Sequence, residues 1–156
     1  MAPEWHDLLG LKWKRHGTDR SGMDCSTVAE EILRRMGADL PETSPHRARI
    51  LGGGRALSQG RDAFASHAGE TELGSFLAYM DSGFERIGVD VKSATKVGDV
   101  VIGADGEGAG KHMYIRVEEH RSVFLTASHI HGVIAVRGFS ILNPIGVYRL
   151  RSDSPT

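Results

Sequence analysis

The amino-acid sequence predicts a single α+β domain, in which N-terminal helices pack on a C-terminal antiparallel sheet of about five strands. Its 156 residues are the size of one ordinary domain. Apolar residues recur at helical spacing early in the chain, and short runs rich in β-branched and aromatic residues follow after residue 84. We expect residues 1–151 to form this domain and residues 152–156 to be a frayed tail.

The first part of the chain predicts helices separated by polar connections. A short helix is expected over Glu4–Leu11, followed by a Gly-containing loop over Lys12–Met23. After a long connection at 38–54, the stretches 55–67 and 71–80 are each predicted to be helical. Residues 51–64 are predicted either to form a lid or to pack against a partner.

The clearest helix begins at Cys25. Asp24 is a favourable N-cap, and Gly37 is a favourable C-terminal stop. One face of the helix is apolar at three- and four-residue spacing, and it consists of Val28, Ala29, Ile32, Leu33 and Met36.

Five short runs predict the strands of the sheet, because each is rich in β-branched or aromatic residues and is bounded by turn residues. They are Asp99–Gly103, His112–Glu118, Ser122–Ser128, Gly132–Gly138 and Ile145–Leu150. Their short connections favour an antiparallel meander, on which the helix from Cys25 would pack.

Composition excludes several classes of protein. A formal net charge of −1 favours neither nucleic acid nor an anionic membrane as a partner. No apolar run reaches the roughly 18 residues of a membrane span, and the N-terminus lacks a secretory signal. One cysteine excludes a disulfide scaffold and a Cys-rich zinc site. We therefore expect cytoplasmic synthesis, no cofactor and no metal.

That single cysteine stands where a thiol can become reactive. As the first helical residue, Cys25 would meet the positive end of the helix dipole, which favours a thiolate. The alternative is that Cys25 is a small buried apolar residue. A nucleophile also needs a base, and His112 opens a strand on the same face as Tyr114 and Arg116. Together Cys25 and His112 would form a pair for acyl transfer.

The segment "GLKWKRHGTDRSGMDCSTVAEEIL" resembles the N-terminal motif of the NlpC/p60 cell-wall cysteine peptidases, a papain-like group. The family motif G-x-x-Y-x-x-G-G-x-x-x-x-G-x-D-C-S fits without a gap from Gly10 to Ser26. "KVGDVVIG", "HMYIRVEE" and "FLTASHIHGVIAV" are similar to its later strands, in the same order. The resemblance covers Gly10–Val136 and implies a papain-like fold.

The resemblance also implies roles for the residues around the thiol. Cys25 would be the nucleophile and its backbone N–H an oxyanion donor, while His112 would be the general base. Asp24 would shape the turn, and Ser26 completes the D-C-S motif at the site.

Two positions of that motif depart from the family. Trp13 replaces the family's Tyr near the oxyanion, and its indole N–H is still a donor. His16 replaces a glycine, where it would narrow the groove or contact substrate.

The third catalytic residue, which orients the base, also differs from the family's His, Asn or Gln. If residues 118–120 form a three-residue loop, His112 faces Thr126, whose hydroxyl would accept from the imidazole ring. A two-residue loop would turn Thr126 to the other face and leave His129 or His131 as substitutes. The two histidines also suggest a metal site, but no carboxylate or cysteine follows at a suitable spacing.

Three functions remain open from the sequence. The resemblance implies a cysteine peptidase or amidase that hydrolyses peptidoglycan stem peptides, often between D-glutamate and diaminopimelate. Such an enzyme would reach the wall through a phage particle, lysis or a specialised secretion route. The departures at Trp13 and Thr126 suggest instead a weakened binding module that contacts phage-tail or secretion-particle proteins. A related acyl transferase or small-amide amidase is the third possibility.

Overall fold

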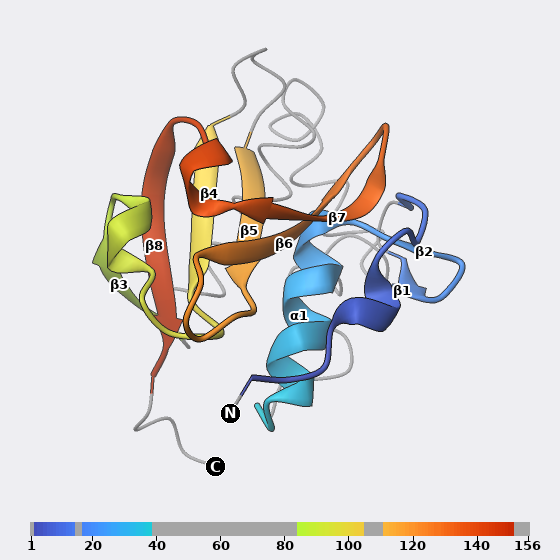
Figure 1. The fold of residues 1–156 in the computed structure, drawn as a ribbon, viewed down its shortest axis with the longest axis horizontal. Coiled ribbons are helices and arrows are strands. Elements are labelled where there is room, and N and C mark those ends of the chain that lie inside the picture. The colour runs from blue at the N-terminus through green and yellow to red at the C-terminus, as the bar shows by residue number, and fades with distance from the viewer. Residues whose placement is uncertain (1, 15–16, 39–83, 105–110, 152–156) are drawn as a thin grey trace, which may run out of the picture.

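The computed structural model describes residues 2–14, 17–38, 84–104 and 111–151. Within this part of the chain, one α-helix packs on a six-stranded antiparallel sheet (Figure 1). The helix α1 (Cys25–Arg35) lies against the strands β5 (Lys111–Arg116) and β6 (Val123–Ser128). The α+β class that the sequence predicts is therefore confirmed.

Both ends of α1 form as its sequence predicts. The Asp24 carboxylate accepts from the Thr27 amide at 2.9 Å, and the Thr27 hydroxyl accepts from the Asp24 amide at 2.9 Å. This reciprocal capping box pairs two amides that the helix leaves without intrahelical partners. At the other end Gly37 has φ +94°, so the Ala38 amide reaches back to the Leu33 carbonyl at 3.0 Å.

All neighbouring strands in the sheet are antiparallel, in the order β3-β8-β4-β5-β6-β7. The five predicted strands are present, with bounds that differ by at most two residues. The sixth, β3, escaped prediction because its sequence FERIG carries two charged residues and no regular apolar alternation. The strands not yet delimited are β3 (Phe84–Gly88), β4 (Val100–Ala104), β7 (Gly132–Arg137) and β8 (Pro144–Leu150).

The predicted simple meander is wrong at its last strand. Strands β4 to β7 follow one another as neighbours, but β8 returns to pair with β4, between β4 and β3. The returning segment contains the 3-10 helix η4 (Gly138–Ser140), and it buries Ile141 against Val101 and Phe124. Figure 1 shows β6 and β7 crossing steeply relative to β8, β4 and β5. The sheet is therefore curled, and the segment between β7 and β8 packs on one of its faces through Ile141.

The two faces of the sheet carry separate apolar clusters. The larger cluster joins Val28 and Ile32 of α1 to Met113 and Ile115 of β5. The smaller cluster lies on the other face, where Tyr114 packs against it. Successive residues of β5 thus point alternately toward α1 and away from it, as strand geometry requires.

The N-terminal segment departs from its predicted elements. Of the expected helix, only a 3-10 turn forms, η1 (His6–Leu8), because Gly10 turns the chain with φ +86° and its amide donates to the Val133 carbonyl. The expected loop contains a small hairpin of β1 (Thr18–Asp19) and β2 (Gly22–Met23).

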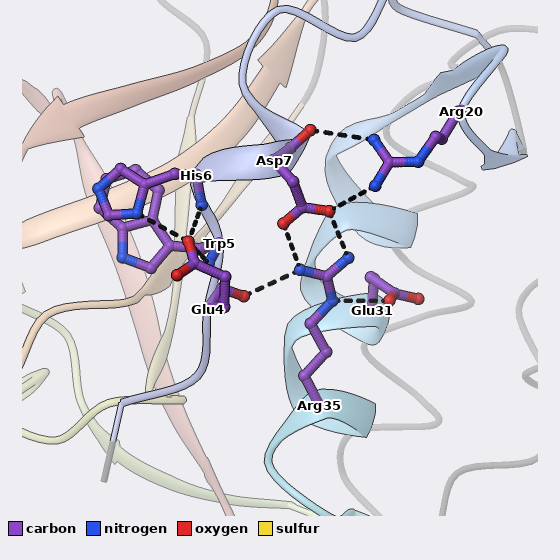
Figure 2. A network of polar contacts seen from close by, with 7 residues as sticks. All are labelled: Glu4, Trp5, His6, Asp7, Arg20, Glu31 and Arg35. Carbon is purple, nitrogen blue, oxygen red and sulfur yellow. Dashed lines mark hydrogen bonds and ion pairs between the residues drawn. The ribbon is translucent and has the colours of Figure 1, made fainter.

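Charged side chains fasten this segment to α1, as Figure 2 shows. The Asp7 carboxylate accepts from two guanidinium nitrogens of Arg35 at 2.7 and 3.0 Å, and from Arg20 at 2.9 Å. Arg35 also donates to the Glu4 carbonyl and to the Glu31 carboxylate. The hydrogen bonds from Arg35 lower the pKa of Asp7 to about 2.

Several predictions concern residues outside the described part. They are the two helices at 55–67 and 71–80, the segment 51–64, His16 and the tail at 152–156. Among the residues that the structure does describe, no helix is long and apolar enough to cross a membrane.

Candidate active site

The fold brings the Cys25 thiol against the backbone of β5. Cys25 is the first residue of α1 and packs against the larger apolar cluster. The backbone amide of Met113 donates a hydrogen bond to its sulfur. Met113 directly follows His112, so the predicted nucleophile lies beside the strand that carries the predicted base.

The thiol lies at the part of β5 that is not paired with β6. β5 and β6 are paired at two positions, Ile115 with Leu125 and Arg116 with Phe124. Toward the start of β5, the Met113 carbonyl accepts instead from the Thr126 hydroxyl at 2.8 Å, while the Met113 amide donates to Cys25. A thiol and a hydroxyl thus replace partners from a neighbouring backbone.

The surroundings of the thiol act against the expected thiolate. Burial raises the pKa of Cys25 to about 12, and the adjacent Asp24 carboxylate also raises it. The amides of Met113, Cys25 and Ser26 act in the lowering direction with smaller effect. Cys25 as a whole is half-buried. Burial and the Asp24 charge therefore oppose the thiolate that the helix dipole was expected to favour, and a raised pKa favours the protonated thiol at neutral pH.

His112 takes the predicted face of its strand. Its ring lies 5.1 Å from the Tyr114 ring, centroid to centroid, at an interplanar angle of 59°. Since Met113 points toward α1, the imidazole of its neighbour lies on the opposite face of the sheet. Across the ladder it faces Gly103, which has no side chain. The structure therefore brings the backbone of His112 next to the thiol and places its ring on the Tyr114 side.

Thr126 does not have the predicted register. The Val117 amide donates to the Val123 carbonyl at 3.0 Å, so the connection is residues 118–122 rather than a three-residue loop. Counting from the pair of Ile115 with Leu125, Thr126 comes level with Tyr114, two residues from His112. The shift of two keeps Thr126 on the predicted face but commits its hydroxyl to the Met113 carbonyl.

The alternative histidines lie in the turn between β6 and β7. The His129 ring stacks on Trp13, with centroids 3.9 Å apart and an interplanar angle of 25°. Trp13 forms a β-bridge with Met23, two residues before Cys25, so this stack lies near the start of α1. The backbone amide of His131 donates to Ser128, and its side chain is exposed.

The remaining motif residue faces inward. The Ser26 hydroxyl donates to the Asp24 carboxylate at 2.8 Å, and Ser26 is 2% exposed. Ser26 therefore supports the helix cap instead of facing a groove.

The sequence did not predict the hydrogen bonds of the Met113 amide and carbonyl, because backbone groups are the same in every residue type. The nearest sequence signal is the apolar alternation of β5, which directs the Met113 side chain to the core and both its peptide groups to a strand edge.

A comparison with models of known protein families and with curated protein sequences finds no match to this chain. The geometry defines a capped helix whose first residue holds a thiol against a strand of an antiparallel sheet. A histidine is the next residue along that strand.

Proposed function

We propose that this protein is a cysteine hydrolase of the NlpC/p60 type, which cleaves peptide bonds in the stem peptides of bacterial peptidoglycan. The observation that supports it most is the contact of the Cys25 sulfur with the Met113 amide, one residue from His112. The substrate class comes from the resemblance of Gly10–Ser26 to the family motif. The enzyme would reach the wall by a phage particle, lysis or specialised secretion.

The first half of the reaction starts from a neutral thiol, because the pKa of Cys25 is raised to about 12. As the sulfur attacks the carbonyl carbon, the S–H proton passes to the His112 ring and the carbonyl electrons move to oxygen. The Cys25 backbone N–H donates to the resulting oxyanion. When this intermediate collapses, the C–N bond breaks and the imidazolium gives its proton to the leaving amine.

The second half regenerates the enzyme. His112 takes a proton from water as the oxygen attacks the thioester carbon, and the C–S bond breaks. The proton then returns to the sulfur, which restores the neutral thiol and releases the carboxylic acid.

This mechanism sets a geometric requirement on His112. A general base acts within about 2.6–3.2 Å of the proton donor, and catalytic hydrogen bonds often tighten when substrate binds. In the free protein the imidazole packs against Tyr114 at 5.1 Å, centroid to centroid. Productive binding of substrate therefore requires the imidazole to turn from Tyr114 toward the edge of β5, where the Met113 amide meets the sulfur. The mechanism assigns Thr126 no orienting bond to that ring.

A second candidate function is a binding module without hydrolytic activity, as part of a phage tail or secretion particle. The raised pKa of Cys25 favours it, because a neutral thiol is a weak nucleophile. The register of β6 favours it too, since Thr126 comes level with Tyr114 and not with His112, its predicted partner.

Hydrolysis of purified sacculi or a synthetic stem peptide separates the two functions. We expect the wild type to release new amine termini, Cys25→Ala to release none, and His112→Asn to be slower by at least about a hundredfold. His120→Asn, in the exposed connection at 118–122, is the matched histidine control and keeps wild-type activity. A folded wild type that releases no amine overturns the hydrolase, and sedimentation with sacculi or particle proteins then tests the binding module.

A further inference from the structure

The Thr126 hydroxyl has a task that the register prediction did not assign to it. Thr126 is 2% exposed, and its hydroxyl donates to the Met113 carbonyl at 2.8 Å. We infer that Thr126 is a positioning residue, which fixes the backbone of Met113 so that the Met113 amide can hold the Cys25 sulfur.

The argument starts from the edge of β5. In an antiparallel strand the N–H and C=O of one residue point to the same edge, where the neighbouring strand normally takes both. At Ile115 that neighbour is Leu125 of β6. Two residues earlier, Thr126 takes the carbonyl of Met113 and Cys25 takes its amide. The two side chains therefore share one residue's pair of backbone groups.

This sharing couples the two side chains. With its carbonyl held by Thr126, Met113 keeps the backbone dihedrals that aim its amide at the sulfur. Without the hydroxyl, a buried carbonyl loses its partner, which is costly, so the backbone moves to find another one. Movement of Met113 would withdraw the amide from Cys25.

A packing role alone would not require the hydroxyl. Valine has nearly the shape of threonine and would fill the same space, whereas serine would keep the hydroxyl and lose a methyl group. The two substitutions thus separate hydrogen bonding from packing at position 126.

The coupling is inferred from the contacts of Thr126 and Cys25 with Met113 alone. Its effect on catalysis rests on the proposed function, in which the sulfur of Cys25 is the attacking atom. In that reaction Thr126 acts through Met113 and touches neither the substrate nor the base.

Amide hydrogen exchange on the full chain, without substrate, tests the coupling. We expect the Met113 amide to exchange about tenfold faster in Thr126→Val, and about tenfold faster in Cys25→Ala. In the double variant the factor stays about tenfold, because both substitutions break the same bond. Thr126→Ser stays within about twofold of the wild type. The Val117 amide, bonded to Val123 farther along the same edge, is the internal reference.

Three outcomes overturn the inference. The first is a roughly hundredfold faster exchange of the Met113 amide in the double variant, because independent contributions multiply. The second is a Met113 amide whose exchange rate does not change in Cys25→Ala. The third is an exchange rate in Thr126→Ser that rises as much as in Thr126→Val. If Thr126→Val does not fold, the exchange rates of the Met113 amide in Cys25→Ala and Thr126→Ser still test the inference, which requires a faster rate in the first and a nearly unchanged rate in the second. Because the exchange experiment uses no substrate, it can contradict the coupling while the hydrolase proposal holds. It can equally support the coupling in a protein that hydrolyses nothing.

Discussion

The Asp24 carboxylate caps the helix that carries Cys25 and, as its direct neighbour, also raises the pKa of that thiol. One side chain therefore both starts α1 and opposes ionisation of its first residue. Cap and charge can be separated, because asparagine is about as good an N-cap as aspartate and carries no charge.

We predict that Asp24→Asn makes Cys25 more reactive. Removal of the negative charge lowers the pKa of the thiol, so at a fixed pH below that value the thiolate fraction rises, by about twofold to tenfold. The rate of iodoacetamide labelling between pH 8 and 10 measures it, and the single cysteine gives no background. Asp24→Ala is the control that removes the cap as well and costs about 1 kcal/mol of folding free energy. Equal labelling rates in Asp24→Asn and the wild type would contradict the prediction.

In the wild type, we predict that labelling of Cys25 rises about tenfold per pH unit from pH 7 to 10 without a plateau. The thiol is protonated below its pKa of about 12, so every unit of pH in this range adds thiolate. A short cysteine peptide, which levels off above a pKa of about 8.5, is the comparison. A plateau near pH 7 in the protein would show a poised thiolate instead. Slow labelling is expected of both candidate functions, so hydrolysis has to separate them.

Acid should weaken the attachment of the N-terminal segment to α1. Asp7 has its pKa lowered to about 2 by Arg35, so its contribution to stability is present above the unfolded value of about 3.8 and is lost as pH falls through 2. We predict that Asp7→Asn lowers the free energy of unfolding at pH 7 by about 1 kcal/mol, since the pair is partly exposed to solvent. Urea titrations at pH 7 and pH 2 measure this loss, which should shrink at pH 2.

The matched control is Glu31→Gln, which removes a pair within α1 but leaves the bond from Arg35 to Asp7. It should cost less, roughly 0.3–0.5 kcal/mol. An Asp7→Asn loss that is the same at both pH values would argue against an ionised carboxylate as its source.

We predict that His129→Ala exposes the Trp13 indole, because the stacked imidazole shields one of its faces. In a Trp5→Phe background, Trp13 is the remaining tryptophan, and its emission should shift to the red while acrylamide quenching increases. His131→Ala is the control from the same turn, since its described hydrogen bond uses the backbone amide. His129→Phe should preserve the shielding, and a red shift as large as that of His129→Ala would count against stacking.

Local signals in the sequence predicted α1 and the strands of the meander well. Asp24 and Gly37 act through the backbone within a few residues, so their effect does not depend on the rest of the fold. The pairing of β5 with β6 was less predictable, because the connection at 118–122 is EEHRS and lacks the Asn-Gly or Gly pairs that fix a hairpin loop length.

For the candidate site, the position of Cys25 was predictable and its ionisation was not. The helix cap fixes the position locally, whereas the pKa depends on burial between α1 and β5, which forms only in the folded protein. The face of His112 followed from strand alternation, and the partner of Thr126 did not, since that depends on the register.

The position of β8 has a consequence for the order of assembly. This strand follows all the others of the described sheet in the chain, yet it lies between β3 and β4. A growing chain that has reached Asn143 carries β4 to β7 but has not yet made the strand that joins them to β3. The sheet on which α1 rests is therefore completed only after Leu150 has been synthesised, so a nascent chain stopped before β8 should present the edge of β4 to whatever strand it meets first.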